Sequence, residues 1–184
     1  MRAQIINQQK IAFCFDLDDT LIKSNAKIYV YDKGKYIKSL TPEDYNFFNE
    51  EDKYDLDFSD FRDPKLVLSA RKYKAWAILE KINDDIESGN LSGDIFIVTA
   101  RTYHVRIAIL ELLKKNNINI HYKNIITFGD DKGSISIADE KKKILSKIKE
   151  NYDKILFYDD NIDNINAGKS IDGIITKLIE NNES

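Results

Sequence analysis

Short apolar runs recur along the chain and alternate with stretches of helical periodicity. Five runs are unbroken or nearly so, at residues 11–15, 95–98, 125–128, 155–158 and 173–175. Runs of this length without polar interruption predict strands buried on both faces, as in parallel sheets. Between the later runs, apolar residues at helical spacing predict helices over residues 102–117, 139–150 and 162–169, with Thr102 and Asp139 as caps of the first two. Strands that alternate with helices predict an α/β fold with a doubly wound parallel sheet.

The stretch between the first two strands is too long for a simple crossover helix. Residues 27–31 and 35–39 read as short strands around Asp32-Lys33-Gly34, which predicts a β-hairpin. Residues 43–63 hold nine acidic, two basic and six aromatic residues. A helix is predicted from Asp63-Pro64 to residue 88, ended by Gly89. We therefore predict a core of residues 1–23 and 64–184 with a small cap inserted at 24–63. The alternative is a surface excursion with no role at the site.

Composition narrows the class of protein. The 184 residues are 42% hydrophobic, which is enough for one compact core. Charged residues make up 32%, but the net charge is only −3, so composition gives no reason to expect a nucleic-acid or membrane surface. Cys14 is the single cysteine, which excludes a disulfide framework. No apolar run has the length of a membrane span or of a signal peptide, and we expect a soluble cytoplasmic protein.

Acidic residues directly follow two of the predicted strands. Asp16 and Asp18 close the first run, and alternation along a strand tends to direct both to one side. Asp159 and Asp160 follow the run at 155–158 in the same way. Since parallel strands end at one edge of a sheet, where ligands bind in such folds, two acidic clusters would meet there. Clustered carboxylates are costly without a cation, and their oxygens suit Mg²⁺.

Two further residue types fall at the same edge. Thr99 follows the strand at 95–98 and would place a hydroxyl there. Lys141 precedes Ile144 and Leu145 by three and four residues, so it lies on the sheet-facing side of its helix. Lys142 and Lys143 continue the run, so spacing alone does not decide which lysine faces the site.

These segments resemble the four motifs of the haloacid dehalogenase superfamily. Phe15-Asp16-Leu17-Asp18-Asp19-Thr20-Leu21 resembles the first motif, Ile97-Val98-Thr99-Ala100-Arg101 the second, Lys141 the third, and Phe157-Tyr158-Asp159-Asp160 with Asn164-Ile165 the fourth. The resemblance spans about residues 11–170, and the order of the motifs agrees. It implies a Rossmann-like core, and the long gap after Asp18 is where this family often inserts a cap. Aspartate at position 18 resembles the phosphatase branch.

The resemblance also implies roles for individual residues. Asp16 would be the nucleophile that forms an aspartyl-phosphate, and Asp18 would protonate the leaving oxygen and then activate water. Thr99, Ala100 and Arg101 would contact the phosphoryl group, although Arg101 could instead brace its loop. Lys141 would neutralise growing negative charge and hold Asp16.

The metal site implied by the resemblance uses the same acids. Mg²⁺ would be bound by Asp16 and Asp160, with the backbone carbonyl of Asp18 contributing. Asp159 would support that shell and is the second choice as a ligand. Asp163 is read as a solvated helix residue.

The resemblance leaves the substrate open. A small phosphorylated metabolite or nucleotide is favoured, because the acidic residues of 43–63 would repel a nucleic-acid strand across the site. The 3′-phosphate end of a polynucleotide is the alternative substrate. A catalytically silent binding or scaffold protein with the same fold is the alternative of another class.

Overall fold

The computed structural model describes residues 9–45, 47–129 and 136–180. Five parallel strands form its central sheet in the order β10-β9-β1-β7-β8. Their bounds are Ile11–Phe15 for β1, Gly93–Thr99 for β7, Ile125–Thr127 for β8, Lys154–Asp159 for β9 and Ile174–Leu178 for β10. The predicted α/β fold with a parallel sheet is confirmed, and each of the five apolar runs corresponds to one of these strands.

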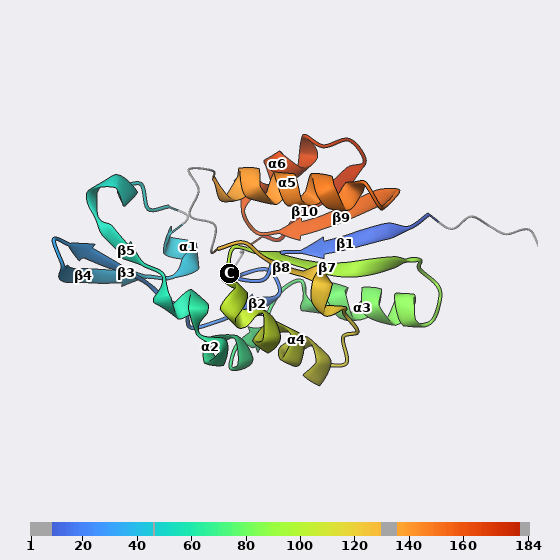
Figure 1. Cartoon of the computed structure of the whole chain (residues 1–184), viewed down its shortest axis with the longest axis horizontal. Helices are drawn as coiled ribbons and strands as arrows, with labels where there is room; N and C mark the ends of the chain where they lie inside the picture. Colours follow the sequence, from blue (N-terminus) through green and yellow to red (C-terminus); the bar gives the residue numbers. More distant parts are fainter. Residues whose placement is uncertain (1–8, 46, 130–135, 181–184) are drawn as a thin grey trace, which may run out of the picture.

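Helices cover both faces of the sheet (Figure 1). Helices α3 (Trp76–Glu87) and α4 (Arg106–Lys115) lie on one face, and α5 (Ile137–Lys149) and α6 (Ile162–Lys169) lie on the other. Phe13 and Phe15 of β1 belong to the apolar cluster on the α3 side, and Cys14 belongs to the cluster under α5 and α6. Because β1 is central and buried on both faces, every one of its positions must be apolar. Burial raises the pKa of the Cys14 thiol.

The chain between β1 and α3 builds a second, smaller sheet. Its three antiparallel strands run in the order β4-β3-β5, with β3 at Ile28–Asp32, β4 at Lys35–Leu40 and β5 at Asp55–Asp57. Lys33 and Gly34 both have positive φ in the turn that joins β3 to β4, as a tight hairpin turn requires. Helix α1 (Pro42–Tyr45) and 3₁₀ turns at Glu51–Lys53 and Ser59–Arg62 complete the segment.

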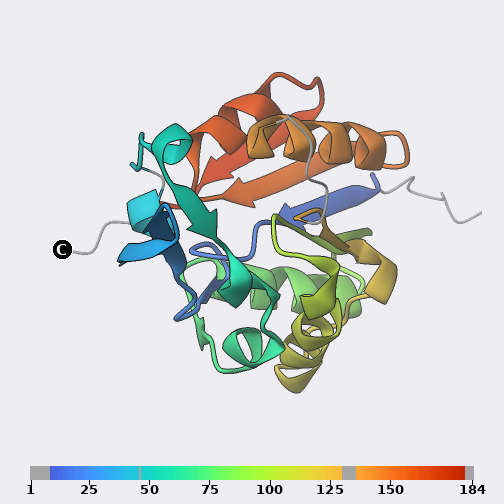
Figure 2. The same ribbon diagram turned by 60° about the vertical axis from the view of Figure 1, so that its left-hand side comes forward.

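We call residues 24–63 the insertion. It has an apolar cluster separate from the two clusters of the central sheet, made of Ile28, Val30, Leu40 and Phe48. In Figures 1 and 2 it lies on the side toward which the arrowheads of β1 and β9 point. Its role as a cap over a site stays a prediction.

Three of the predicted helices differ from the structure. The stretch predicted as one helix from Pro64 to residue 88 forms α2 (Pro64–Leu68), the short strand β6 (Arg71–Lys72) and α3. Strand β6 pairs antiparallel with β2 (Ile22–Lys23), and Ala75 N–H donates to the carbonyl of Thr20. Backbone pairing with the loop after β1 thus takes hydrogen bonds that a continuous helix would need.

The helix predicted from Thr102 begins instead with a 3₁₀ turn at Tyr103–Val105, and α4 proper starts at Arg106. The predicted cap Asp139 is also wrong. Helix α5 begins earlier, and Ser136 is its N-cap, with its side chain accepting from the Asp139 N–H.

None of the helices in the described ranges combines the length and the apolar composition that a bilayer span requires.

Candidate active site at the carboxyl edge of the sheet

Strand β1 delivers the first pair of acids to the middle of this edge. The Asp16 N–H donates to the Tyr158 carbonyl at 2.9 Å, which continues the pairing of β1 with β9 for one more residue. Alternation directs Asp16 to the face covered by α5, opposite to Phe15, and only 7% of its surface is exposed. The chain then turns sharply, with Asp19 at a φ of 56°. That turn moves Asp18 out of line with Asp16, so the two carboxylates acquire different partners.

Lys141 joins Asp16 to Asp159. Its Nζ lies 2.5 Å from Asp16 Oδ1 and 2.6 Å from Asp159 Oδ2, and its side chain is 2% exposed. Lys142 and Lys143 are exposed, and Lys143 pairs with Glu140 on the surface. Of the three lysines that the sequence left open, the structure therefore brings Lys141 to the acids. Its catalytic role stays a prediction.

Among the described residues, this buried group holds more carboxylates than ammonium groups. Burial alone would lower the pKa of the Lys141 ammonium, but the carboxylates of Asp159 and Asp16 outweigh burial and raise it. Burial raises the pKa of Asp16; Lys141 opposes that shift, and the carboxylates of Asp159 and Asp160 add to it. Within the described ranges, the carboxylates of Asp16, Asp159 and Asp160 thus cluster around the ammonium of Lys141.

Asp159 is held entirely by the protein. It is fully buried, and its Oδ1 accepts from the Asn161 N–H at 2.9 Å and from Asn164 Nδ2 at 3.0 Å, while Oδ2 accepts from Lys141. Both carboxylate oxygens are therefore engaged. This arrangement favours the supporting role for Asp159 over its role as a direct metal ligand, and both remain predictions.

Asp160 is half-buried, whereas Asp16 and Asp159 are buried. Its Oδ1 accepts from Thr20 Oγ1 at 3.1 Å. Burial, and then the neighbouring Asp159 carboxylate, raise the pKa of Asp160 to about 6. The negative charge of Asp160 in turn raises the pKa of Asp16, so the two carboxylates interact across the ends of β9 and β1. Asp163, by contrast, is an exposed residue of α6.

Asp18 forms a bidentate salt bridge with Arg101. Arg101 Nε donates to Asp18 Oδ2 at 2.7 Å, and Nη2 donates to Oδ1 at 2.7 Å. Arg101 is 1% exposed, and its Nη1 has no hydrogen-bond partner in the part of the chain that the structure describes. The Arg101 N–H donates to Thr99 Oγ1 at 3.2 Å, so the buried Thr99 hydroxyl helps to shape this loop. Ala100 between them is partly exposed.

A close backbone approach fixes the loop after β7. A Cβ at Gly129 would lie 2.0 Å from the carbonyl oxygen of Ala100, so glycine is required there. The Gly129 N–H donates to the Arg101 carbonyl at 3.1 Å. The loop that carries Thr99, Ala100 and Arg101 is thereby held against the chain that follows β8.

The site fits a divalent cation by its charge and its donors. Among the residues that the structure describes, no three His, Cys, Asp or Glu side chains form a metal-binding group. Mg²⁺ does not require one, because it keeps several waters and binds proteins through one or two carboxylates. Asp16 and Asp160 supply two such carboxylates, and their pKa values show that they interact across the strand ends.

Sequence reasoning missed three supporting residues. Thr20 bonds to Asp160, Asn164 bonds to Asp159, and Ser24 bonds to Asp18 through its Oγ at 3.3 Å. Thr20 and Asn164 lie inside the stretches that resemble family motifs, which was the signal available. Nothing in the sequence indicated Ser24.

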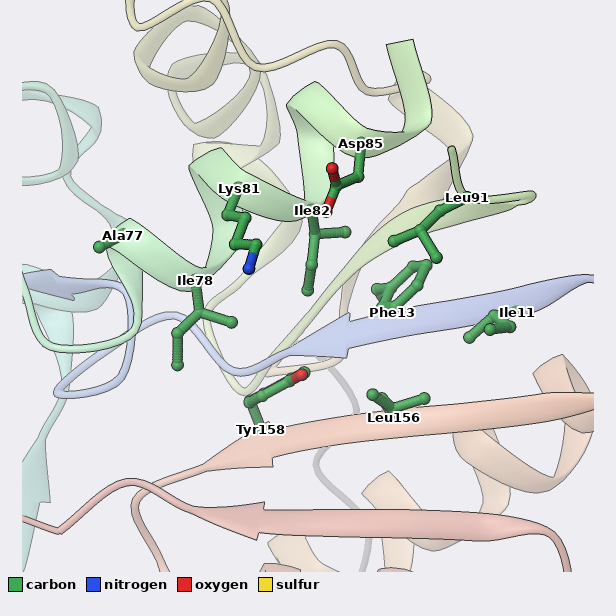
Figure 3. Close-up of a pocket in the computed structure, with 10 residues that line it drawn as sticks. All are labelled: Ile11, Phe13, Ala77, Ile78, Lys81, Ile82, Asp85, Leu91, Leu156 and Tyr158. Carbon is green, nitrogen blue, oxygen red and sulfur yellow. The ribbon is translucent and has the colours of Figure 1, made fainter. Parts of the chain in front are cut away.

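An apolar groove of about 490 Å³ lies on the other face of the sheet (Figure 3). It runs between α3 and strands β1 and β9, with Phe13 and Leu156 on its floor and Lys81 and Asp85 on the helix above. Tyr158 lies at one end and stacks on Phe15 at 4.6 Å between ring centroids. None of the acids at the carboxyl edge lines this groove, so it is separate from the candidate site.

Comparisons with known proteins find a similar fold but no matching family or sequence. No protein-family model matches the chain, and no curated protein matches its sequence. Among solved structures, it is similar to a chain in the structure of the Pnkp1/Rnl/Hen1 RNA repair complex, with a TM-score of 0.56 and 12% sequence identity. The match covers 96% of this chain and 44% of that chain, so this chain spans less than half of the neighbour's length. At this identity the likeness shows a shared fold alone.

Proposed function

We propose that this chain is a Mg²⁺-dependent phosphomonoesterase of the haloacid dehalogenase type, with Asp16 as its nucleophile. The observation that carries the proposal is the convergence of Asp16, Asp160 and Lys141 at the carboxyl edge of the sheet. The motif resemblance and the α/β fold support the same assignment. Bound Mg²⁺ would neutralise the carboxylates and polarise the phosphoryl oxygens, which lets a dianion approach them.

The chain's own residues would carry the first chemical step. One carboxylate oxygen of Asp16 attacks phosphorus, and the bond from phosphorus to the leaving oxygen breaks. The form of the enzyme in which Asp18 is protonated carries out this step: Asp18 gives its proton to that oxygen, and the product alcohol departs. Lys141 holds the nucleophile Asp16 in place, because its ammonium binds the Asp16 carboxylate on the side of the sheet covered by α5.

The second step regenerates the enzyme. Asp18, now ionised, takes a proton from a water molecule as the water oxygen attacks phosphorus. The bond between phosphorus and the Asp16 oxygen breaks, and inorganic phosphate leaves. Asp18 must reach both the leaving oxygen and the water, so its placement by Arg101 is part of the mechanism.

Two substrate classes are distinguished by different observations. Residues 43–63 of the insertion hold nine acidic residues, and the insertion lies on the side toward which β1 and β9 point, which favours a small phosphorylated metabolite or nucleotide over a long polyanion. The occurrence of this fold in an RNA repair complex favours the phosphorylated end of a polynucleotide as the second candidate. Initial rates on mononucleotides, sugar phosphates and 3′-phosphorylated oligonucleotides would separate them. Turnover restricted to the oligonucleotides would reverse our ranking.

The nucleophile is tested with p-nitrophenyl phosphate. We expect hydrolysis with Mg²⁺, none with EDTA, and loss of turnover in Asp16→Asn. Asp163→Asn is the matched control, because the exposed Asp163 has no place in the mechanism. Circular dichroism should show both variants folded. Metal-dependent turnover that survives Asp16→Asn would show that the nucleophile is elsewhere.

A further inference from the structure

The two ends of the insertion meet at one buried side chain. Ser24, at the start of the insertion, accepts a hydrogen bond through its Oγ from Arg101 Nη2 at 2.9 Å. Phe61, near its end, places its ring 5.1 Å from Arg101 Cζ, a cation–π distance. Asp60 ties the same two ends together, because its carboxylate accepts from the Lys27 N–H at 2.9 Å. Arg101 itself belongs to the loop after β7, in the core.

The same guanidinium determines where Asp18 points. Both carboxylate oxygens of Asp18 accept from Arg101 at 2.7 Å, and Ser24 Oγ donates to one of them at 3.3 Å. The Asp18 side chain keeps 16% exposure, whereas that of Arg101 keeps 1%. The buried Arg101 therefore fixes the orientation of the more exposed Asp18.

Phe61 has a specific part in this arrangement. Arg101 Nη1 is buried without a hydrogen-bond partner in the described residues, so hydrogen bonds do not hold every edge of the guanidinium. The aromatic face of Phe61 supplies a contact for the guanidinium that an aliphatic side chain would not reproduce. A change at Phe61 would loosen Arg101 and, through it, Asp18.

We propose that Arg101 is a positioning residue that couples the insertion to Asp18: Phe61 and Ser24 fix the guanidinium, and the guanidinium aims the carboxylate at the leaving oxygen. The proposal rests on the proposed function for the role of Asp18. It assigns to the insertion a role in protonation of the leaving oxygen, which is distinct from a role in substrate selectivity.

The test exploits the leaving group. An alkyl phosphate needs a proton on its departing oxygen, whereas p-nitrophenolate is a stable anion that departs without one. For both substrates, kcat/KM reports the steps up to phosphoryl transfer to Asp16. It therefore excludes the later hydrolysis of the aspartyl-phosphate, in which Asp18 acts as a base. Misplacement of Asp18 should therefore lower kcat/KM selectively for the alkyl phosphate. A general loss of structure would lower both values alike.

We expect Phe61→Leu to lower kcat/KM roughly tenfold for an alkyl phosphate and less than about twofold for p-nitrophenyl phosphate, as the loss of one cation–π contact allows. Phe61→Tyr retains the ring and should behave like the wild type. Phe47→Leu is the matched control, because Phe47 lies in the insertion, is 80% exposed and has no contact with Arg101 among the interactions described. Arg101→Lys should show a larger selective loss, since one ammonium cannot reproduce the bidentate salt bridge.

The outcomes separate the two proposals. Equal losses for both substrates in Phe61→Leu, or no loss for either, would overturn the positioning role while leaving the phosphatase assignment intact. A wild-type protein that hydrolyses neither substrate with Mg²⁺ would overturn the proposed function and this inference with it. If Arg101→Lys fails to fold, the Phe61 variants decide the matter, because Phe61 is only partly buried.

Discussion

Lys141 is the residue on which the electrostatics of the site depend. Its side chain is 2% exposed and compensates two buried carboxylates, Asp16 and Asp159. Removing one partner of a buried ionic group is costly because it leaves charge without compensation. The sequence placed a lysine near this position but could not choose within the run, since the choice depends on the rotation of α5 against the sheet.

Replacing Lys141 should destabilise the protein strongly. We expect Lys141→Met to lower the free energy of unfolding by about 3 kcal/mol. Lys143→Met, at an exposed pair with Glu140, should change it by less than about 0.5 kcal/mol. Urea unfolding followed by circular dichroism measures both. Similar small changes in the two variants would contradict a buried charge cluster.

Asp160 gives a prediction for pH dependence without metal. Because its pKa in the folded protein is raised to about 6 from 3.8, the folded state holds this proton more tightly than the unfolded state. Stability in EDTA should therefore fall as pH rises through the interval between those values.

Asp160→Asn removes this penalty. The variant should be more stable than the wild type by about 3 kcal/mol near pH 7 in EDTA, and the advantage should vanish near pH 4. Asp163→Asn should match the wild type at both pH values. An Asp160→Asn variant that is less stable than the wild type at neutral pH would show that the ionised carboxylate is compensated within the protein.

At the level of elements, the sequence predicts those that depend on local apolar pattern and misses those that depend on pairing with distant segments. The five strands of the sheet follow from their apolar runs, because burial on both faces leaves an uninterrupted signal. The break between α2 and α3 does not, because it depends on pairing of Arg71–Lys72 with Ile22–Lys23, some fifty residues earlier in the chain. Strand β5 carries Asp-Leu-Asp, which resembles a loop until β3 pairs with it.

The start of α5 is testable by paired substitutions. Ser136 caps the helix, whereas Asp139, which the sequence favoured, lies inside its first turn. We expect Ser136→Ala to lower the free energy of unfolding by about 1 kcal/mol and Asp139→Asn to lower it by less than half as much. Thermal denaturation compares the two. A larger loss in Asp139→Asn would place the functional cap at 139.

At the scale of the whole molecule, the described residues form three apolar clusters, and the one in the insertion is separate from the other two. Its four buried residues contribute to neither of the clusters that pack against the central sheet. The ends of the segment are close together, since Tyr29 of β3 pairs with Asp57 of β5. The central sheet should therefore not depend on the insertion for its core.

We expect the central domain to fold after residues 29–57 are replaced by a short Gly-Ser linker. Ser24 and Phe61, which contact Arg101, remain in this variant. The variant should retain a cooperative thermal transition and the helical circular dichroism of α3 to α6. A loss of the cooperative transition would show that the small sheet supports the large one.

The strand order has a consequence for how the protein is made. The first strand of the chain is the middle strand of the sheet, flanked by β7 and β9. Asp16 lies 125 residues before Lys141, so the ribosome must finish α5 before the ion pair can form. Pairings this distant in sequence slow folding, and until β9 emerges the nascent β1 keeps an unpaired edge that can aggregate. The nascent chain should therefore need chaperones through most of translation, and this need should decrease only after β9 has been synthesised.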